Sequence, residues 1–101
     1  MADIMRGADI PFMIKNFPVG ATIVRLDFAQ QNKIIVTKTT DDFTYDAETG
    51  KYNALITQAE ALRFDDKHKI DIQLSYHNNG HATRTRISSA SPDKIIYEGE
   101  I

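Results

Sequence analysis

The stretch KIDIQLSYHNNGH, residues 69–81, decides the fold class of this 101-residue chain. Apolar residues occupy every second position from 70 to 76, and polar residues stand between them. A period of two places the apolar side chains on one face of an extended strand, whereas a helix would scatter them around its axis. The pattern therefore predicts a half-buried strand of an antiparallel sheet over Lys69–His77.

A tight turn is predicted directly after this strand. Asn79 and Gly80 form the dipeptide that most strongly favours a two-residue type I′ turn, because both central residues of that turn adopt positive φ. The return strand, Ala82–Ser89, is polar and carries Arg84 and Arg86. This composition is typical of an edge strand, whose charges discourage pairing with other chains.

The same alternation recurs along the rest of the chain. It predicts further short strands at Ile10–Lys15, Thr22–Phe28, Lys33–Thr39, Phe43–Tyr45, Tyr52–Ile56 and Lys94–Glu98. The segment Thr57–Leu62 breaks the alternation, and its Thr57 and Glu60 have the spacing of a capping box, which predicts one or two helical turns. Seven or eight short strands in three hairpins favour an all-β, two-layer antiparallel β-sandwich, with a small barrel as the alternative.

Composition narrows the class of protein. The length fits a single domain over residues 1–101. Lys and Arg number 12 against 14 Asp and Glu, and the net charge of −2 argues against binding to nucleic acid or an anionic membrane. The absence of cysteine excludes a disulfide scaffold, a thiolate nucleophile and a thiolate zinc site. The apolar runs are far shorter than the about 20 residues of a membrane-spanning helix, and the N-terminal residues lack the pattern of a secretory signal.

Side chains able to carry chemistry are present without an ordering motif. His77 and His81 flank the turn and would need a third ligand to hold zinc, so exposed histidines are the alternative. The acidic loop of residues 41–48 could coordinate calcium, although its spacing differs from that of an EF-hand. No serine lies in a nucleophile elbow, and the five glycines are isolated from one another. We therefore expect no enzymatic activity, no catalytic residue and no cofactor.

Several stretches, taken in order, resemble a group of small phage and prophage proteins of Gram-positive bacteria that are encoded among virion structural genes. They are RGADIPFMIK (6–15), TIVRLDFAQQNKIIVTK (22–38), TYDAETGKYNALITQAEALRF (44–64), KIDIQLSY (69–76) and the apolar–acidic end IIYEGEI (95–101). The pattern is also similar to the N-terminal immunoglobulin-like domain of phage baseplate upper proteins. The resemblance implies an immunoglobulin-like sandwich and a non-enzymatic component of the tail, baseplate or neck. It also implies assembly in the bacterial cytoplasm and a final location in the virion.

A protein of this kind would act by burying surface against other virion proteins or against copies of itself in a homo-oligomer. The alternation places Val24 inward, and places Ile23 and Ile35 on the opposite, outward phase. Ile23 and Ile35, together with Arg84 and Arg86, are therefore candidate interface residues. Their alternatives are burial or ordinary exposure for the isoleucines, and ion pairing or solvation for the arginines.

The two ends of the chain, Met1–Arg6 and Gly99–Ile101, are candidate docking arms or simply frayed ends. A second hypothesis is a small adhesion module that binds carbohydrate or calcium. It requires aromatic side chains exposed on one sheet face, or carboxylates that converge in the loop of residues 41–48, which contains Asp41, Asp42, Asp46 and Glu48.

Overall fold

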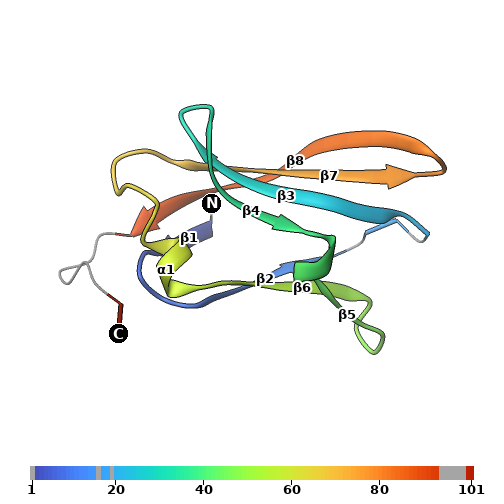
Figure 1. The fold of residues 1–101 in the computed structure, drawn as a ribbon, viewed down its shortest axis with the longest axis horizontal. Helices are drawn as coiled ribbons and strands as arrows, with labels where there is room; N and C mark the ends of the chain where they lie inside the picture. Colours follow the sequence, from blue (N-terminus) through green and yellow to red (C-terminus); the bar gives the residue numbers. More distant parts are fainter. Residues whose placement is uncertain (1, 16, 19, 94–99) are drawn as a thin grey trace.

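Two β-sheets packed face to face make up the protein, seen in a computed structural model that describes residues 2–15, 17, 18, 20–93, 100 and 101 (Figure 1). The larger sheet has the strand order β1-β8-β7-β3-β4, formed by Ala2–Met5 (β1), His81–Asp93 (β8), Ile70–Asn78 (β7), Thr22–Gln30 (β3) and Lys33–Thr39 (β4). The smaller sheet has the order β2-β6-β5, formed by Ile10–Ile14 (β2), Lys51–Ile56 (β6) and Thr44–Asp46 (β5). The described residues also form a 3₁₀ turn, η1 (Thr40–Asp42), and a short helix, α1 (Gln58–Ala61). The predicted all-β sandwich is confirmed.

The strand order is that of an immunoglobulin-like Greek key. β8, β7, β3 and β4 follow one another as strands G, F, C and C′ do in that fold, and β2, β6 and β5 follow the order B, E and D. β1 adds a strand parallel to β8, and the other pairs are antiparallel. α1 lies between β6 and β7 in the chain, within the segment Thr57–Leu62 for which the sequence predicts one or two helical turns.

The two long hairpins close as their turn residues dictate. Asn79 and Gly80 have φ values of 53° and 77°, which confirms the type I′ turn between β7 and β8. Gln31 and Asn32, between β3 and β4, also have positive φ values, 51° and 62°.

The core fills the space between the sheets. Its largest fully buried side chains come from both layers and from the segment after α1: Phe28, Phe64, Leu26, Ile56, Ile70, Ile72 and Val36. Phe28 lies at the centre, with the ring of Phe12 at 5.4 Å and that of Phe64 at 6.3 Å between centroids, both edge to face. The apolar phase predicted for Ile70, Ile72 and Leu74 is confirmed, since each is at most 3% exposed.

A β-bulge at the start of β3 reverses the predicted phase there. Ile23 pairs with Tyr76 and Arg25 with Ser75, so the register shifts across Val24. Ile23 is consequently only 4% exposed, whereas Val24 is 38% exposed. The prediction that Ile23 faces outward is wrong, because strict alternation cannot account for the extra residue that a bulge inserts.

A second bulge changes the phase of β4. Phe28 pairs with Val36 and Ala29 with Ile34, so the register shifts at Ile35. Ile35 packs against the core as a partly buried residue, and Ile34 is 54% exposed. The predicted outward position of Ile35 is therefore also wrong, for the same physical reason.

The N-terminal segment is part of the larger sheet. β1 pairs in parallel with residues Ala90–Asp93 of β8, so Ala2–Met5 is a strand and not a free docking arm. This pairing extends β8 to Asp93, beyond the end of the predicted strand Ala82–Ser89. The predicted strand Lys94–Glu98 lies outside the described residues.

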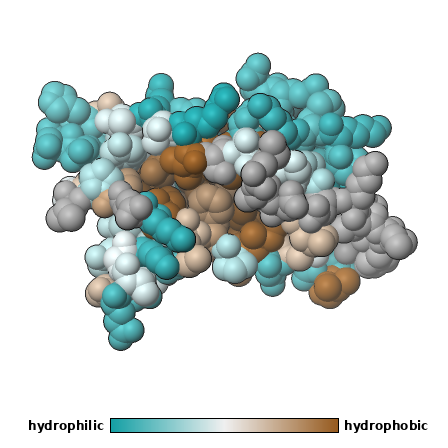
Figure 2. Space-filling model, turned by 180° about the vertical axis from the view of Figure 1, so that it is seen from behind, coloured by the Kyte–Doolittle hydropathy of each residue, from teal (hydrophilic) through white to brown (hydrophobic). Residues whose placement is uncertain are grey.

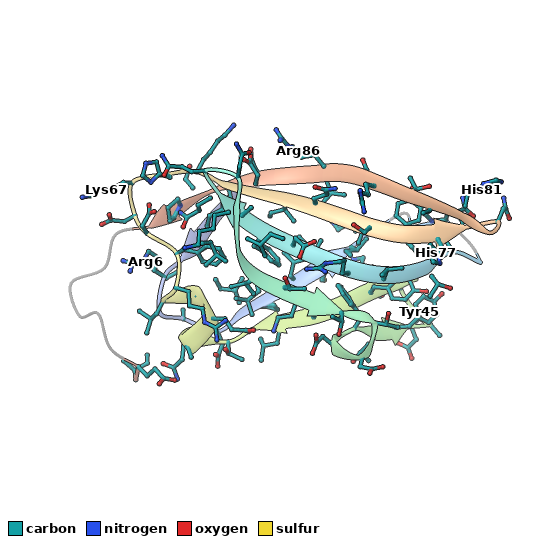
Figure 3. All side chains as sticks on the ribbon, turned by 45° about the horizontal axis from the view of Figure 1, so that its top comes forward. Arg6, Tyr45, Lys67, His77, His81 and Arg86 are labelled. Atoms are coloured by element: carbon teal, nitrogen blue, oxygen red, sulfur yellow. The ribbon has the colours of Figure 1, made fainter. Side chains whose placement is uncertain are left out.

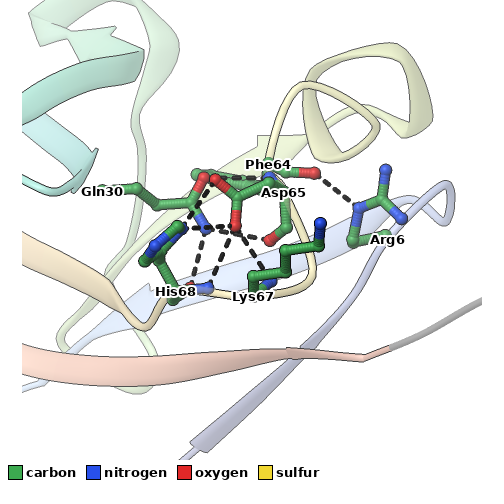
Figure 4. Close-up of polar contacts among 6 residues, drawn as sticks. All are labelled: Arg6, Gln30, Phe64, Asp65, Lys67 and His68. Atoms are coloured by element: carbon green, nitrogen blue, oxygen red, sulfur yellow. Dashed lines mark hydrogen bonds and ion pairs between the residues drawn. The ribbon is translucent and has the colours of Figure 1, made fainter.

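A buried glutamine fixes the loop between α1 and β7 (Figure 4). The side chain of Gln30, 4% exposed, donates to the carbonyl oxygens of Asp65 (2.9 Å) and His68 (2.8 Å). Its own carbonyl oxygen accepts the backbone N–H of Asp65 at 3.0 Å. Arg6, also buried, donates from Nε to the carbonyl oxygen of Phe64. The end of β3 and the connection between β1 and β2 thus hold the same loop.

An ion pair joins the larger sheet to α1. Nζ of Lys38, on β4, lies 2.6 Å from Oε1 of Glu60, and both side chains are mostly buried. Burial raises the pKa of Glu60, but hydrogen bonds from Lys38 and from the backbone and side chain of Thr57 more than offset this and leave the pKa below its usual value. Glu60 therefore both caps the helix and ties it to the sheet.

Candidate assembly surface

One side of the sandwich brings an edge of each sheet together. β1 covers the outer edge of β8 over residues 90–93, and no other strand of the described residues pairs with that edge from His81 to Ile87. β2 pairs with β6 on one side and, in the part of the chain that the structure describes, with no strand on the other. Two rows of strand backbone without a neighbouring strand therefore border the same side of the molecule.

An open, largely apolar groove lies between these two edges. It has a volume of about 360 Å³ and is lined by Phe12, Met13, Ile14, Lys15 and Ile87. Met13 is 51% exposed and Ile87 is 37% exposed, whereas Ile14 belongs to the core. Figure 2 views the molecule from behind and shows apolar surface gathered along the middle of that face.

The strand that borders the groove carries exposed cationic side chains. Arg84 lies opposite Ser75 and Arg86 opposite Gln73 in the pairing of β8 with β7. Figure 3 shows Arg86 on the outer side of the larger sheet, where its side chain is 67% exposed and its Nη1 lies 4.0 Å from Oδ1 of Asp71. Lys15 lines the groove itself, and the two arginines project from the bordering strand on the outer face of the larger sheet, where they line the hollows of that face. We call the groove and this border, Lys15, Arg84 and Arg86, the β2–β8 surface.

The predicted interface residues divide into two groups in the structure. Arg84 and Arg86 lie on the exposed strand beside the groove. Ile23 and Ile35 contribute to or pack against the core and do not reach that surface. The apolar residues of the groove, Met13 and Ile87, are not among the predicted interface residues. Pro11 is compatible with the edge position of β2, because proline has no N–H to donate to a neighbouring strand.

The outer face of the larger sheet holds a second, more polar hollow of about 280 Å³. Beside it, Arg25 donates to both carboxylate oxygens of Asp27, and this hydrogen bond and charge raise the pKa of Arg25. Asp27 also accepts the hydroxyl of Thr37 at 2.7 Å, so its polar groups are satisfied within the sheet. None of the described residues that line this hollow is aromatic, whereas the carbohydrate hypothesis requires stacking rings.

The histidines and the acidic loop do not form a metal centre in the described part of the chain. No group of three or more histidine, aspartate or glutamate side chains there is placed to hold a metal ion. His77 and His81 lie exposed at the tip of the β7–β8 hairpin (Figure 3). In the acidic loop, Asp42 accepts the N–H of Thr39 at 2.8 Å and Asp46 accepts that of Glu48 at 3.0 Å. The carboxylates of Asp42 and Asp46 therefore accept hydrogen bonds within local turns.

No family model, curated protein or solved structure matches this chain. Among the described residues, no helix has the length and apolar character needed to cross a membrane. The function is therefore inferred from the fold and from the β2–β8 surface.

Proposed function

We propose that this protein is a non-enzymatic assembly module that binds a neighbouring protein through the β2–β8 surface. The observation that carries this proposal is the apolar groove between two strand edges, lined by exposed Met13 and Ile87. Strand edges tend to pair with other chains, and proteins usually shorten, charge or cover them. An edge that lies beside exposed apolar side chains is suited to contact with another protein.

The size of the groove sets the strength of one contact. Complete burial of a methionine or isoleucine side chain contributes about 1.5–3 kcal/mol. Met13 is 51% and Ile87 37% exposed, so covering both contributes roughly half of the full value for each, or about 2 kcal/mol in all. Such a contact is weak alone and gains strength when many copies assemble side by side. We therefore expect the purified protein to be a monomer in solution and to bind its neighbours stably only within a larger particle.

The particle that we propose is the virion of a phage or prophage, with other virion proteins as partners and assembly in the bacterial cytoplasm. The support is the resemblance of the sequence to small virion structural proteins, together with the immunoglobulin-like sandwich that this resemblance implies. The net charge of −2 favours protein partners over nucleic acid or an anionic membrane. A position in the tail, baseplate or neck follows from the same resemblance.

Two matched variants test the proposal. Ile87→Asp places a charge in the groove, and Val24→Asp places the same charge at a site of nearly equal exposure, 38% against 37%, on another strand. Particles would be purified from lysogens that carry each variant, and the protein in them measured by mass spectrometry after cross-linking. We expect incorporation of the wild-type and Val24→Asp chains and loss of the Ile87→Asp chain. Absence of the wild-type chain from purified particles would refute the proposed function.

A further inference from the structure

We propose that the occupant of the groove is an extended strand of a partner protein, which pairs with the outer edge of β8 over residues 81–87. This inference rests on the proposed function and names the kind of partner segment. The strand would enlarge the five-stranded sheet by one member, the binding mode known as β-strand addition. Backbone hydrogen bonds would supply affinity, and the side chains on each face of the strand would supply specificity.

β8 suits this pairing better than β2 does. β2 has only five residues and includes Pro11, which has no N–H to donate. Residues 81–87 of β8 contain no proline, so every residue there has both a donor and an acceptor. β1 already occupies the same edge of β8 at residues 90–93, which shows that this edge accepts a strand. The added strand would lie in line with β1, on the part of the edge that β1 leaves uncovered.

The length of the uncovered edge limits the partner segment. Seven residues at about 3.4 Å each span roughly 24 Å of an antiparallel strand. Side chains of a strand alternate between its two faces, so a segment of this length directs three or four of them into the groove.

The two faces of the added strand would meet different surroundings. On the inner face lie Phe12, Ile14 and Ile87, which favour apolar side chains. On the outer face, the neighbouring positions of β8 carry Arg84 and Arg86, both exposed. Opposite charges on adjacent strands attract, and like charges repel. The partner segment is therefore expected to alternate apolar and acidic residues.

Synthetic heptapeptides test this inference without prior identification of the partner. The probes are EIEVEIE, its basic counterpart KIKVKIK, and EEIIVEE, which has the acidic composition without the alternation. Each is titrated into ¹⁵N-labelled protein, and amide shifts are followed by NMR. We expect saturable shifts confined to residues 81–87 and 10–15 with the first peptide, and affinity lower by about tenfold for the basic one, the effect of turning two attractive cross-strand pairs into repulsive ones.

The double variant Arg84→Glu/Arg86→Glu provides the matched control, since both side chains are exposed and the fold can be checked in the same spectra. It should prefer the basic peptide. The inference would be overturned by equal affinity for all three peptides or by shifts on a different face. It would also be overturned by the absence of saturable binding up to about 1 mM, which corresponds to a binding free energy of about −4 kcal/mol. Equivalent shifts on addition of unlabelled copies of the chain would also overturn it, in favour of a second copy as occupant. If peptides fail but the wild-type chain is cross-linked in particles through the β2–β8 surface and Ile87→Asp is lost from them, only this inference fails. If peptides bind but the protein is absent from particles, only the proposed function fails.

Discussion

Replacement of Gln30 by leucine should destabilise the protein far more than the loss of one ordinary polar side chain. Gln30 makes three hydrogen bonds to the loop between α1 and β7, at 2.8, 2.9 and 3.0 Å, and is 4% exposed (Figure 4). A protein hydrogen bond contributes a net of about 0.5–1.5 kcal/mol, so the three together account for about 1.5–4.5 kcal/mol. Leucine has a similar size but offers neither donor nor acceptor, so the loss falls on hydrogen bonding.

The assay is equilibrium unfolding in urea at 25 °C, followed by far-ultraviolet circular dichroism. Gln73→Leu is the matched control, because Gln73 is exposed on the outer face of the larger sheet. A surface substitution of this kind changes stability by about 0.5 kcal/mol or less. For a domain of this size, the Gln30→Leu variant should also melt at least about 6 °C lower. If Gln30→Leu and Gln73→Leu unfold within about 0.5 kcal/mol of each other, the loop is not held as the hydrogen bonds suggest.

Three further predictions concern the core, the ion pair and a turn. Ile23→Ala should cost about 2–5 kcal/mol and Val24→Ala less than about 1 kcal/mol in urea unfolding; the reverse order would contradict the bulge in β3. The pKa of Glu60 is lower in the folded protein, so the unfolded chain binds more protons in acid. The stability that ionised Glu60 contributes above its unfolded pKa is therefore lost as the pH falls through its folded pKa. Glu60→Gln should flatten the dependence of the unfolding free energy on pH below about pH 5, and an unchanged slope would contradict this. Gly80→Ala should cost about 1–2 kcal/mol because φ is +77°, a backbone conformation that alanine rarely adopts. Open space surrounds the position, so the added methyl group meets no clash and the cost comes from the backbone alone. A neutral outcome in thermal melts would contradict this strain.

The sequence predicts much of this fold because local rules act on consecutive residues. The alternation from Ile70 to Tyr76 and the dipeptide Asn79–Gly80 each determine their structure without help from distant residues. The capping box of Thr57 and Glu60 is likewise present, although the α1 helix is shorter than the predicted segment.

The errors arise where pairing between strands decides the outcome. At Ile23 and Ile35 a bulge inserts one residue, and nothing in the local alternation reveals it. β1 contains only four residues and forms by pairing with β8, which lies more than eighty positions away in the chain. Local sequence patterns do not predict the groove either, since Met13 and Ile87 come from different sheets and meet only in the packed sandwich.

Amide hydrogen exchange along β8, measured by mass spectrometry in the isolated protein and in purified particles, tests whether a partner strand covers residues 81–87. The claim that a partner strand covers residues 81–87 predicts slower exchange there in particles, by about tenfold or more, a change of about 1.4 kcal/mol. Residues 71–77 of β7, already paired on both sides, serve as the internal reference. Equal exchange of residues 81–87 in both samples, or absence of the chain from particles, would contradict the account.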